Sequence, residues 1–259
     1  MSRSIKINKR SSKWYGWLPD LPDRRDLPYS AIAPRVRKLP RKIDLQANCS
    51  PVEDQGQLGS CTANSLVGAL EFLENKGGTS FVDLSRLFIY YNERVIEGTV
   101  DQDSGAFIRD GIKSLARQGV CPENDWPYKI ATFRKRPSAS CYRTAKKHRI
   151  ISYHRINTLD EMRDCLANGL PFVFGFTVYE SFESQEVAKS GVVDLPAAEE
   201  KVVGGHAVMA VGYNDSQKRF LIRNSWGTDW GKKGYFTMPY NYLGDRNLSD
   251  DFWTIRASK

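Results

Sequence analysis

Apolar residues follow a helical rhythm in the first half of the chain. From Cys61 onward they recur every three or four positions, at Ala63, Leu66, Val67, Leu70 and Leu73, and Gly77-Gly78 follows shortly after them. This spacing predicts a helix from Cys61 to Glu74 that buries one face and ends before the two glycines.

Three further helices are predicted from start and stop signals. Ser85 is a suitable N-cap for a helix over residues 86–97, and residues 104–118 are expected to form another helix that ends before a glycine. Thr158, with a glutamate three residues later, has the spacing of a capping box, which predicts a short helix that ends at Asn168.

The second half of the chain has a different pattern. Short runs rich in β-branched and aromatic residues are separated by Gly, Asn, Asp and Pro, which is typical of strands; they cover residues 172–179, 202–213, 219–223, 234–238 and 252–256. Helices first and antiparallel strands later predict an α+β protein of two lobes, with a cleft where the lobes meet.

Composition and length are those of an ordinary globular protein of 259 residues and 29.4 kDa. No apolar run approaches the roughly 20 residues that a membrane-spanning helix needs, so we expect no membrane span. The first ten residues are polar and basic, without the apolar stretch of a secretory signal peptide. The sequence therefore does not decide where the protein acts: it can stay in the cytoplasm or be exported by a non-classical route.

The positive charge is concentrated at the N-terminus. Residues 1–38 contain ten Lys and Arg against three Asp, which is +7 of the net +8 of the whole chain. Such a segment can be a solvated or acid-paired tail, which composition favours, or it can bind nucleotide, nucleic acid or an anionic surface.

Within this extension, residues 14–34 are rich in proline and cannot form a regular helix or a central strand. The aromatic residues Trp14, Tyr15 and Trp17 are unusual in a segment this polar. We expect the segment to run extended, with these side chains as anchors on another surface.

The five cysteines show neither a CxxC pair nor a Cys/His cluster with the spacing of a zinc site. We expect no metal ion and no other cofactor. Cys49, Cys121, Cys141 and Cys165 are expected to be small buried residues, mostly reduced, although two disulfides are also possible. Cys61 is different, because the N–H groups at a helix start favour the thiolate and make a reactive thiol.

One of the three histidines stands apart from the others. His148 and His154 lie in or near a basic stretch and are expected at the surface. His206 lies in an otherwise apolar strand entered through two glycines, where an imidazole needs a partner or a function. Asn224 follows at the end of the next predicted strand, within reach of His206 if the two strands are neighbours.

Together these residues resemble the papain-like cysteine peptidases. The resemblance rests on Gln55 six residues before Cys61, on His206 in a Gly-His-Ala-Val strand, and on Asn224 in an Asn-Ser-Trp-Gly turn followed by a second Trp-Gly at 230–231. Four positions in the right order, each in the right local context, make the resemblance specific.

The resemblance implies the papain-like two-lobed fold over residues 39–259. The helical lobe would cover about residues 50–147 and the antiparallel, β-barrel-like lobe about residues 148–259, with the active site between them. It implies a peptidase, predominantly an endopeptidase, that acts on peptides or proteins, and we expect it to be a monomer.

The resemblance also assigns a role to each residue. Cys61 would be the nucleophile, present as a thiolate beside a His206 imidazolium before substrate arrives. Gln55, with the backbone N–H of Cys61, would stabilise the oxyanion, Asn224 would orient the imidazole, and Trp226 would cover the Asn–His hydrogen bond unless it is ordinary core.

The sequence departs from the plant and lysosomal members of this family. Leu58 stands where those enzymes place a disulfide cysteine, Thr62 replaces an aromatic residue, and residues 103–107 replace the usual cysteine-glycine-glycine segment. A divergent branch, bacterial or viral, is indicated. Phe107, Phe176 and Gly205 are candidates for substrate binding, with core packing the alternative for the two phenylalanines.

The extension of 38 residues is too short and too broken by proline for the helical prosegment of family zymogens. We expect it to lie across the cleft as an inhibitory or regulatory segment, with residues 14–27 as the part that occupies the cleft. Two other readings stay open: a catalytically idle papain-like binding protein, and a peptidase whose basic segment binds nucleotide or nucleic acid.

Overall fold

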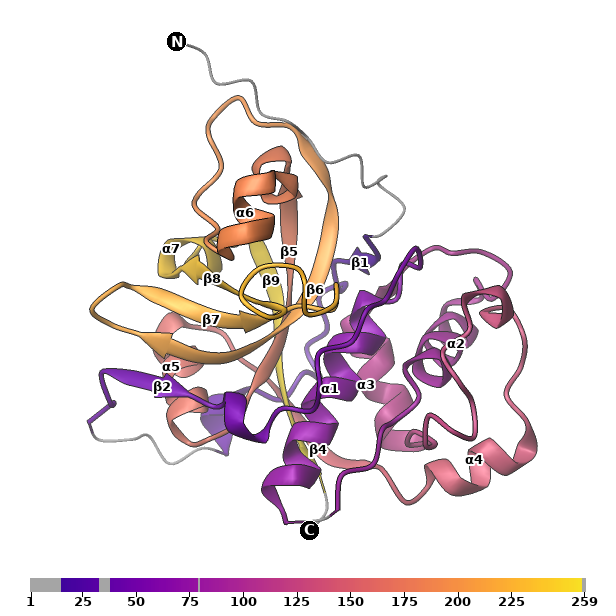
Figure 1. The fold of residues 1–259 in the computed structure, drawn as a ribbon. Helices are drawn as coiled ribbons and strands as arrows, with labels where there is room; N and C mark the ends of the chain where they lie inside the picture. The colour runs from indigo at the N-terminus through magenta and orange to yellow at the C-terminus, as the bar shows by residue number, and fades with distance from the viewer. Residues whose placement is uncertain (1–14, 33–37, 79, 258–259) are drawn as a thin grey trace.

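A helical part and a sheet lie side by side in the protein (Figure 1), whose structure is a computed structural model that describes residues 15–32, 38–78 and 80–257. The expected anchor Trp14 and most of the basic residues of the N-terminal extension lie outside these ranges. The expectations for them therefore stay predictions.

Four helices make up the helical part: α1 (Cys61–Lys76), α2 (Arg86–Glu97), α3 (Ile108–Arg117) and α4 (Ala139–Ala145). The predicted start of α1 and both ends of α2 are confirmed, and the Ser85 hydroxyl accepts the N–H of Phe88, as an N-cap should. The prediction for α3 was wrong at its start, because Ala106 and Phe107 are drawn into a short strand, β3 (Ala106–Phe107).

The sheet has seven antiparallel strands. Along it the order is β4 (Ile150–Arg155), β9 (Ser249–Ala257), β5 (Phe172–Tyr179), β6 (Val202–Asn214), β7 (Arg219–Arg223) and β8 (Tyr235–Pro239), and β2 (Lys42–Asp44) also pairs with β6. All five predicted strands are present. The neighbouring positions of β6 and β7 were needed for His206 to meet Asn224, and they are observed.

Short elements account for most of what the pattern missed. Helix α5 (Leu159–Ala167) was predicted, and the Thr158 hydroxyl accepts the backbone N–H of Glu161, as in a capping box. The Glu161 carboxylate, however, accepts the backbone N–H of Asn157 rather than that of Thr158. The remaining elements are too short for periodicity to reveal: α6 (Gln185–Ser190), α7 (Tyr240–Gly244), η2 (Tyr29–Ala31), η3 (Gln46–Asn48), η4 (Ile130–Thr132) and η5 (Glu180–Glu183).

Strand β4 was missed because its sequence lies beside a run of basic residues. One consequence is that His154 is buried on this strand, contrary to the expected surface position, and its burial lowers its pKa. His148 is partly buried, and its Nδ1 lies 2.9 Å from the carboxylate of Glu74.

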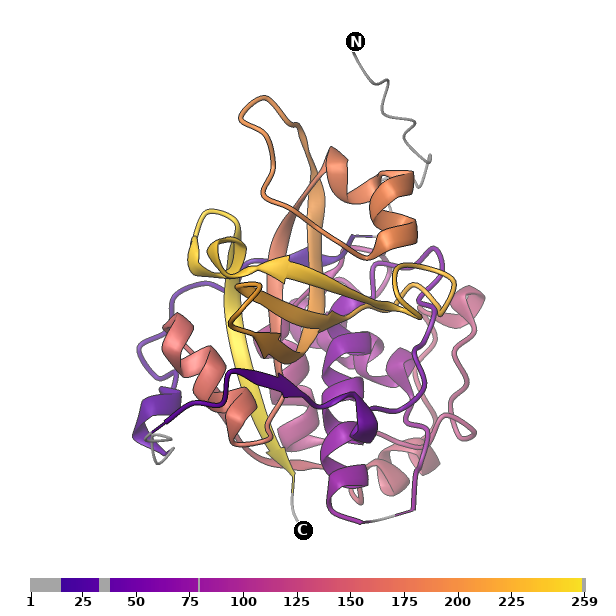
Figure 2. The same cartoon turned by 60° about the vertical axis from the view of Figure 1, so that its left-hand side comes forward.

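Helix α1 joins the two parts. It packs against α2 and α3 on one side and against β6 and the neighbouring strands on the other, so most of its residues are buried, and Figure 2 shows it running beside the sheet. A second apolar cluster covers the other face of the sheet, under α5 and α7. Among the described residues no helix is both long and apolar enough to cross a membrane.

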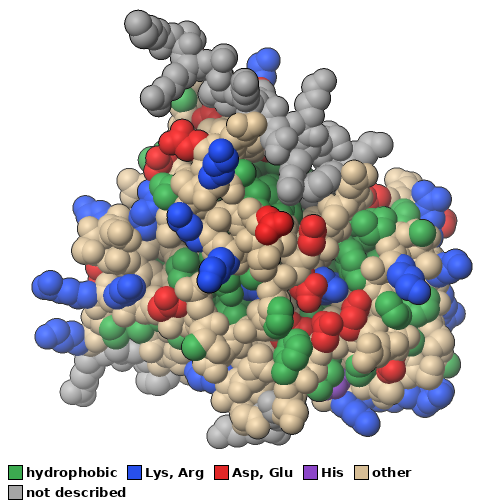
Figure 3. Space-filling view, viewed as in Figure 1, with side chains coloured by type: hydrophobic (Ala, Val, Ile, Leu, Met, Phe, Trp, Pro, Cys, Tyr) green, Lys and Arg blue, Asp and Glu red, His purple; other side chains and the backbone are tan. Residues whose placement is uncertain are grey.

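The N-terminal segment enters between the two parts through β1 (Trp17–Leu18). This strand pairs in parallel with β3 of the helical part, and it also contacts β5 and β6 of the sheet. On the face shown in Figure 3, acidic side chains gather near the junction of the two parts and many basic ones lie toward the flanks.

Candidate active site

Cys61 is the first residue of α1 and is fully buried. Backbone groups of Ala207 on β6, of Gly16 in the N-terminal segment and of Thr62 lie close enough to its sulfur to lower the pKa of the thiol. The thiol therefore lies at the junction, directly beside the strand that carries His206. The preceding residue, Ser60, is held by Tyr128, whose hydroxyl lies 2.5 Å from the serine oxygen.

Gln55 is also fully buried and links the loop before α1 to the sheet. Its side-chain oxygen accepts the Ser225 hydroxyl at 2.6 Å, its backbone N–H donates to the Ser225 carbonyl at 2.9 Å, and its amide nitrogen donates to the Leu58 carbonyl at 2.9 Å. These bonds fix the orientation of the amide and bring its nitrogen into the turn that leads to Cys61.

His206 and Asn224 meet as the strand order requires. The Nε2 atom of His206 lies 2.8 Å from the Oδ1 atom of Asn224, and the indole of Trp226 stacks on the imidazole with a centroid distance of 4.9 Å. Among the described residues, no hydrogen-bond partner reaches the other ring nitrogen, Nδ1. Trp226 thus lies over the imidazole and is also part of the buried apolar cluster of the sheet, so its role as a cover for the Asn–His pair stays a prediction.

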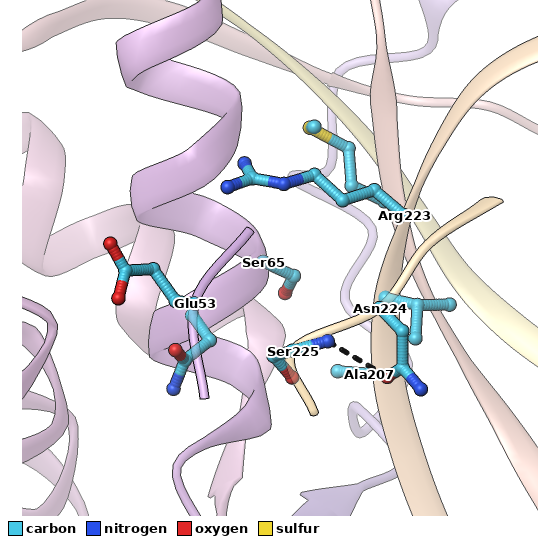
Figure 4. A pocket seen from close by; sticks show the side chains of 9 residues that line it. Glu53, Ser65, Ala207, Arg223, Asn224 and Ser225 are labelled. Carbon is cyan, nitrogen blue, oxygen red and sulfur yellow. Dashed lines mark hydrogen bonds between the residues drawn. The ribbon is translucent and has the colours of Figure 1, made fainter. Parts of the chain in front are cut away.

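A small cavity of about 10 Å³ lies behind Asn224, between α1 and the sheet (Figure 4). The close-up shows the Asn224 oxygen also accepting the backbone N–H of Ser225, and the guanidinium of Arg223 extending toward α1. A space of this size holds at most about one water molecule, so it is not a substrate site.

The electrostatics differ from the expected thiolate–imidazolium pair. Burial raises the pKa of the Cys61 thiol to about 12, while the backbone bonds from Ala207 and Gly16 offset part of this effect. Burial also lowers the pKa of His206 to about 4, and the bond to Asn224 opposes that shift. Both shifts favour the neutral forms, because the N-terminal segment excludes water from the thiol and the imidazole.

The N-terminal segment packs on both sides of the site with little clearance. The backbone of Gly16 lies against Gly59, where an added Cβ would come within 1.8 Å of the Gly59 carbonyl oxygen. The ring of Tyr15 approaches the His206 ring at 6.0 Å, and its hydroxyl donates to Glu183 at 2.6 Å. Residues 15–17 therefore cover the thiol and the imidazole together.

The three candidates for substrate binding separate in the structure. Phe176 is fully buried among the rings of the sheet cluster, which favours the core alternative, and half-buried Phe107 lies in β3 beside Leu18. Gly205 lies directly under Trp17. Sequence reasoning missed Tyr128 and Ser225, and of these only Ser225 carried a signal, since it stands inside the Asn-Ser-Trp motif.

The cysteines other than Cys61 lie away from this arrangement. All five are free, and the thiols of Cys121 and Cys141 contact each other. Within residues 15–32, 38–78 and 80–257, no group of three or more His, Cys, Asp or Glu side chains is arranged to hold a metal ion.

Comparison with known proteins adds independent information. Residues 39–251 match the family described as papain family cysteine protease. The uncharacterized peptidase C1-like protein L477 of Acanthamoeba polyphaga mimivirus is 41% identical, over 95% of this chain and 87% of that protein. Cysteine proteinase 3 of Entamoeba histolytica is 26% identical, over 81% of this chain but only 66% of that protein.

The solved structure of xylellain, a cysteine protease from Xylella fastidiosa, superposes with a TM-score of 0.88 and 43% identity. The match covers 98% of this chain and 99% of xylellain. The expected fold, a helical part with an antiparallel sheet, and the expected relation to bacterial and viral proteins are confirmed.

Proposed function

Because the chain belongs to the papain family of cysteine proteases, we propose that it is an endopeptidase that uses Cys61, His206, Asn224 and Gln55. The observation that carries this proposal is the His206–Asn224 hydrogen bond beneath Trp226, with the Cys61 thiol at the adjacent residue of β6. We also propose residues 39–259 as the catalytic domain and residues 1–38 as its regulatory extension.

The reaction follows from the positions of these groups. When water and substrate enter, His206 takes the proton of Cys61, and the sulfur attacks the peptide carbonyl. The Gln55 amide and the Cys61 backbone N–H stabilise the oxyanion that forms. His206 then protonates the leaving amine, the thioester remains on Cys61, and a water activated by His206 hydrolyses it. Asn224 keeps the imidazole in the orientation that each transfer needs.

In the arrangement described here, residues 15–17 occupy the space that a substrate needs. Their contacts with Cys61, His206 and Gly205 support an inhibitory role, and the neutral thiol and imidazole fit a resting state. The segment must move away before the thiolate–imidazolium pair can form.

Two full-length variants test the proposal. Cys61→Ala should abolish cleavage of a mixed peptide library, read by mass spectrometry. Gly16→Ala should raise kcat/KM at least tenfold, because its methyl group cannot fit against the Gly59 carbonyl oxygen 1.8 Å away. Gly244→Ala is the matched control, since nothing lies within 4 Å of its added methyl group. Cleavage that persists in Cys61→Ala contradicts the mechanism, and unchanged kinetics in a folded Gly16→Ala protein contradict the inhibitory role.

A further inference from the structure

Two of the buried cysteines lie together at the two ends of one long loop. Cys121 precedes the loop and lies beside the start of α2, Cys141 is the third residue of α4, and the two buried thiols contact each other. The remaining non-catalytic thiols lie elsewhere, Cys49 beside Tyr235 and Cys165 on α5. Cys121 and Cys141 are therefore placed to react with each other.

Backbone and side-chain contacts hold both ends of the loop independently of a bond between the sulfurs. The carbonyl of Cys121 accepts the N–H of Ser85, the N-cap of α2, at 2.8 Å. At the other end, the sulfur of Cys141 donates to the Asp125 carbonyl at 3.4 Å, and the Thr144 hydroxyl donates to the Asp125 carboxylate at 2.7 Å. Because the fold already brings the two sulfurs into contact, a disulfide between them needs only a local adjustment.

The loop between the two cysteines carries a support of the active site. Residues 122–138, all within the described chain, contain η4 as their only helix and no strand. The hydroxyl of Tyr128 in this loop donates to the Gln55 carbonyl at 2.9 Å and lies 2.5 Å from the Ser60 hydroxyl. A covalent link at the base of the loop reduces the freedom of the unfolded loop and so stabilises the folded one.

We propose that Cys121 and Cys141 form a disulfide by exchange with a small-molecule disulfide of the oxidised glutathione type, and that this bond stabilises the loop that supports Gln55 and Ser60. One cysteine attacks oxidised glutathione and releases one glutathione thiol, and the other then attacks the mixed disulfide and releases the second. The protein loses two protons and two electrons, and the two glutathione thiols take them up. The bond does not depend on the proposed peptidase function, since neither sulfur belongs to the catalytic groups.

Burial determines when this exchange takes place. The attacking group is a thiolate, and burial raises the pKa of the Cys121 thiol, with the neighbouring Cys141 raising it further. Both thiols are therefore slow to react while the loop is closed. Cys141 lies in the first turn of α4, at the outer edge of the helical part (Figure 1), and its neighbours Ser138, Ala139 and Ser140 are exposed. Folding of the chain, or opening of this turn, gives glutathione access to the pair.

Alkylation of full-length Cys61→Ala protein tests the bond, because this variant lacks the nucleophile and cannot cleave itself. Folded protein is incubated overnight, or refolded from urea, with reduced and oxidised glutathione or with dithiothreitol; it is then unfolded without reductant and alkylated with iodoacetamide. Intact mass should show two alkylated thiols, Cys49 and Cys165, after refolding with glutathione and four after dithiothreitol. Digestion without reductant should give a peptide pair joined through Cys121 and Cys141. Four alkylated thiols in every sample, glutathione retained on either cysteine, or a bond to another cysteine overturn the proposal.

Thermal unfolding of the same protein measures the stabilisation. The oxidised sample should melt about 5–10 °C above the reduced sample, as expected for a link that closes a loop of this length in a protein of this size. Cys141→Ala in the same background should melt at the same temperature in both buffers, whereas the control Cys49→Ala should keep the difference. Each variant is compared with itself, so lost packing does not enter the result. A difference that persists in Cys141→Ala overturns the proposal.

Hydrogen exchange read by mass spectrometry locates the effect. The N–H groups of Trp126, Lys129 and Phe133 are hydrogen-bonded within the loop, so their exchange reports its opening. We expect these amides to exchange at least about fivefold more slowly in the oxidised protein, and those of β5 and β6 to be unchanged. Equal exchange of the loop amides in the two samples would show that the bond does not hold the support of the active site. None of these measurements requires peptide cleavage, so they stand apart from a failure of the peptidase proposal.

Discussion

The helical side and the sheet side of the active site hold their residues by different means. On the helical side, Gln55 and Ser60 are fixed by hydrogen bonds from side chains such as Tyr128, 2.9 Å from the Gln55 carbonyl and 2.5 Å from the Ser60 hydroxyl. On the sheet side, His206 has a single side-chain hydrogen bond within the described part of the chain and is otherwise enclosed by rings, with Trp226 stacked on it and Phe176 at 5.7 Å.

This difference predicts two kinds of failure. Removing a single polar atom on the helical side should change the rate with little loss of stability, because the fold there does not depend on that atom. Removing a ring on the sheet side should lower both the rate and the stability, because the ring belongs to the core that holds the imidazole in position.

Apart from loss of the nucleophile itself, the largest effect is expected from Gln55→Ala on the helical side. Loss of an oxyanion donor reduces kcat by roughly 10²- to 10³-fold in enzymes of this chemistry, and KM should change little. Steady-state kinetics on a fluorogenic peptide in the Gly16→Ala background measure it, with exposed Gln217→Ala as control. A loss below tenfold would mean that Gln55 serves only to join the loop to Ser225.

Trp226→Ala should show the double loss expected on the sheet side. The cavity should cost about 3–5 kcal/mol of unfolding free energy, and water that reaches the Asn224–His206 bond should lower kcat about tenfold. Trp230→Ala is a matched control, because this ring packs on Trp226 at 5.2 Å rather than on His206. Urea unfolding and kinetics should show similar destabilisation in both variants and a rate loss in Trp226→Ala alone; equal rate losses would contradict the specific role of Trp226.

The sequence predicts the sheet side better than the helical side. The apolar run and the two glycines around His206 locate β6, and Asn224 follows at the end of β7. The contact between His206 and Asn224 therefore requires only that β6 and β7 are neighbours in the sheet. The supports of the helical side come from distant loops: Tyr128 is more than 60 residues from Ser60, and no periodicity connects the two.

The state of the catalytic pair was also beyond the sequence. A helix start and a nearby imidazole both favour a thiolate. The backbone of Gly16, however, lies over the sulfur and excludes water, so that burial becomes the largest influence on the pKa of the thiol and raises it. The chemistry of the pair could be predicted from residue types, whereas its resting charge depends on a segment that packs from elsewhere in the chain.

Tyr128→Phe tests the helical side more gently. The change removes one hydroxyl that bridges Gln55 and Ser60 and leaves the ring, with the guanidinium of Arg86 4.6 Å from its centroid, in place. We expect kcat to fall about tenfold and the melting temperature to fall by only a few degrees, since the two lost hydrogen bonds contribute about 1 kcal/mol each. Tyr142→Phe, which removes a hydroxyl bonded to Asn92, should leave kcat unchanged. Equal kinetics for both variants would place Tyr128 outside the support of the active site.

The smallest effect on activity is expected at Glu93, a fully buried carboxyl on α2 that accepts the hydroxyl of Thr62, the residue after the nucleophile, at 3.0 Å. Burial raises its pKa well above the ordinary 4.5, so it is protonated in the folded protein over a range of pH where the unfolded chain has lost the proton. The folded state then binds more protons than the unfolded state, and stability falls as pH rises above 4.5 toward the folded-state pKa.

Glu93→Gln removes this proton and keeps the shape, so kcat at pH 7 should change less than about twofold. The melting temperature of the variant relative to the parent should rise between pH 5 and pH 8, because only the parent loses stability there. Thermal unfolding at several pH values measures the difference, with exposed Glu199→Gln as control. If the variant loses stability with rising pH as steeply as the parent, Glu93 is ionised in the folded protein. The helical side would then tolerate a buried negative charge in contact with Thr62, the residue after the nucleophile.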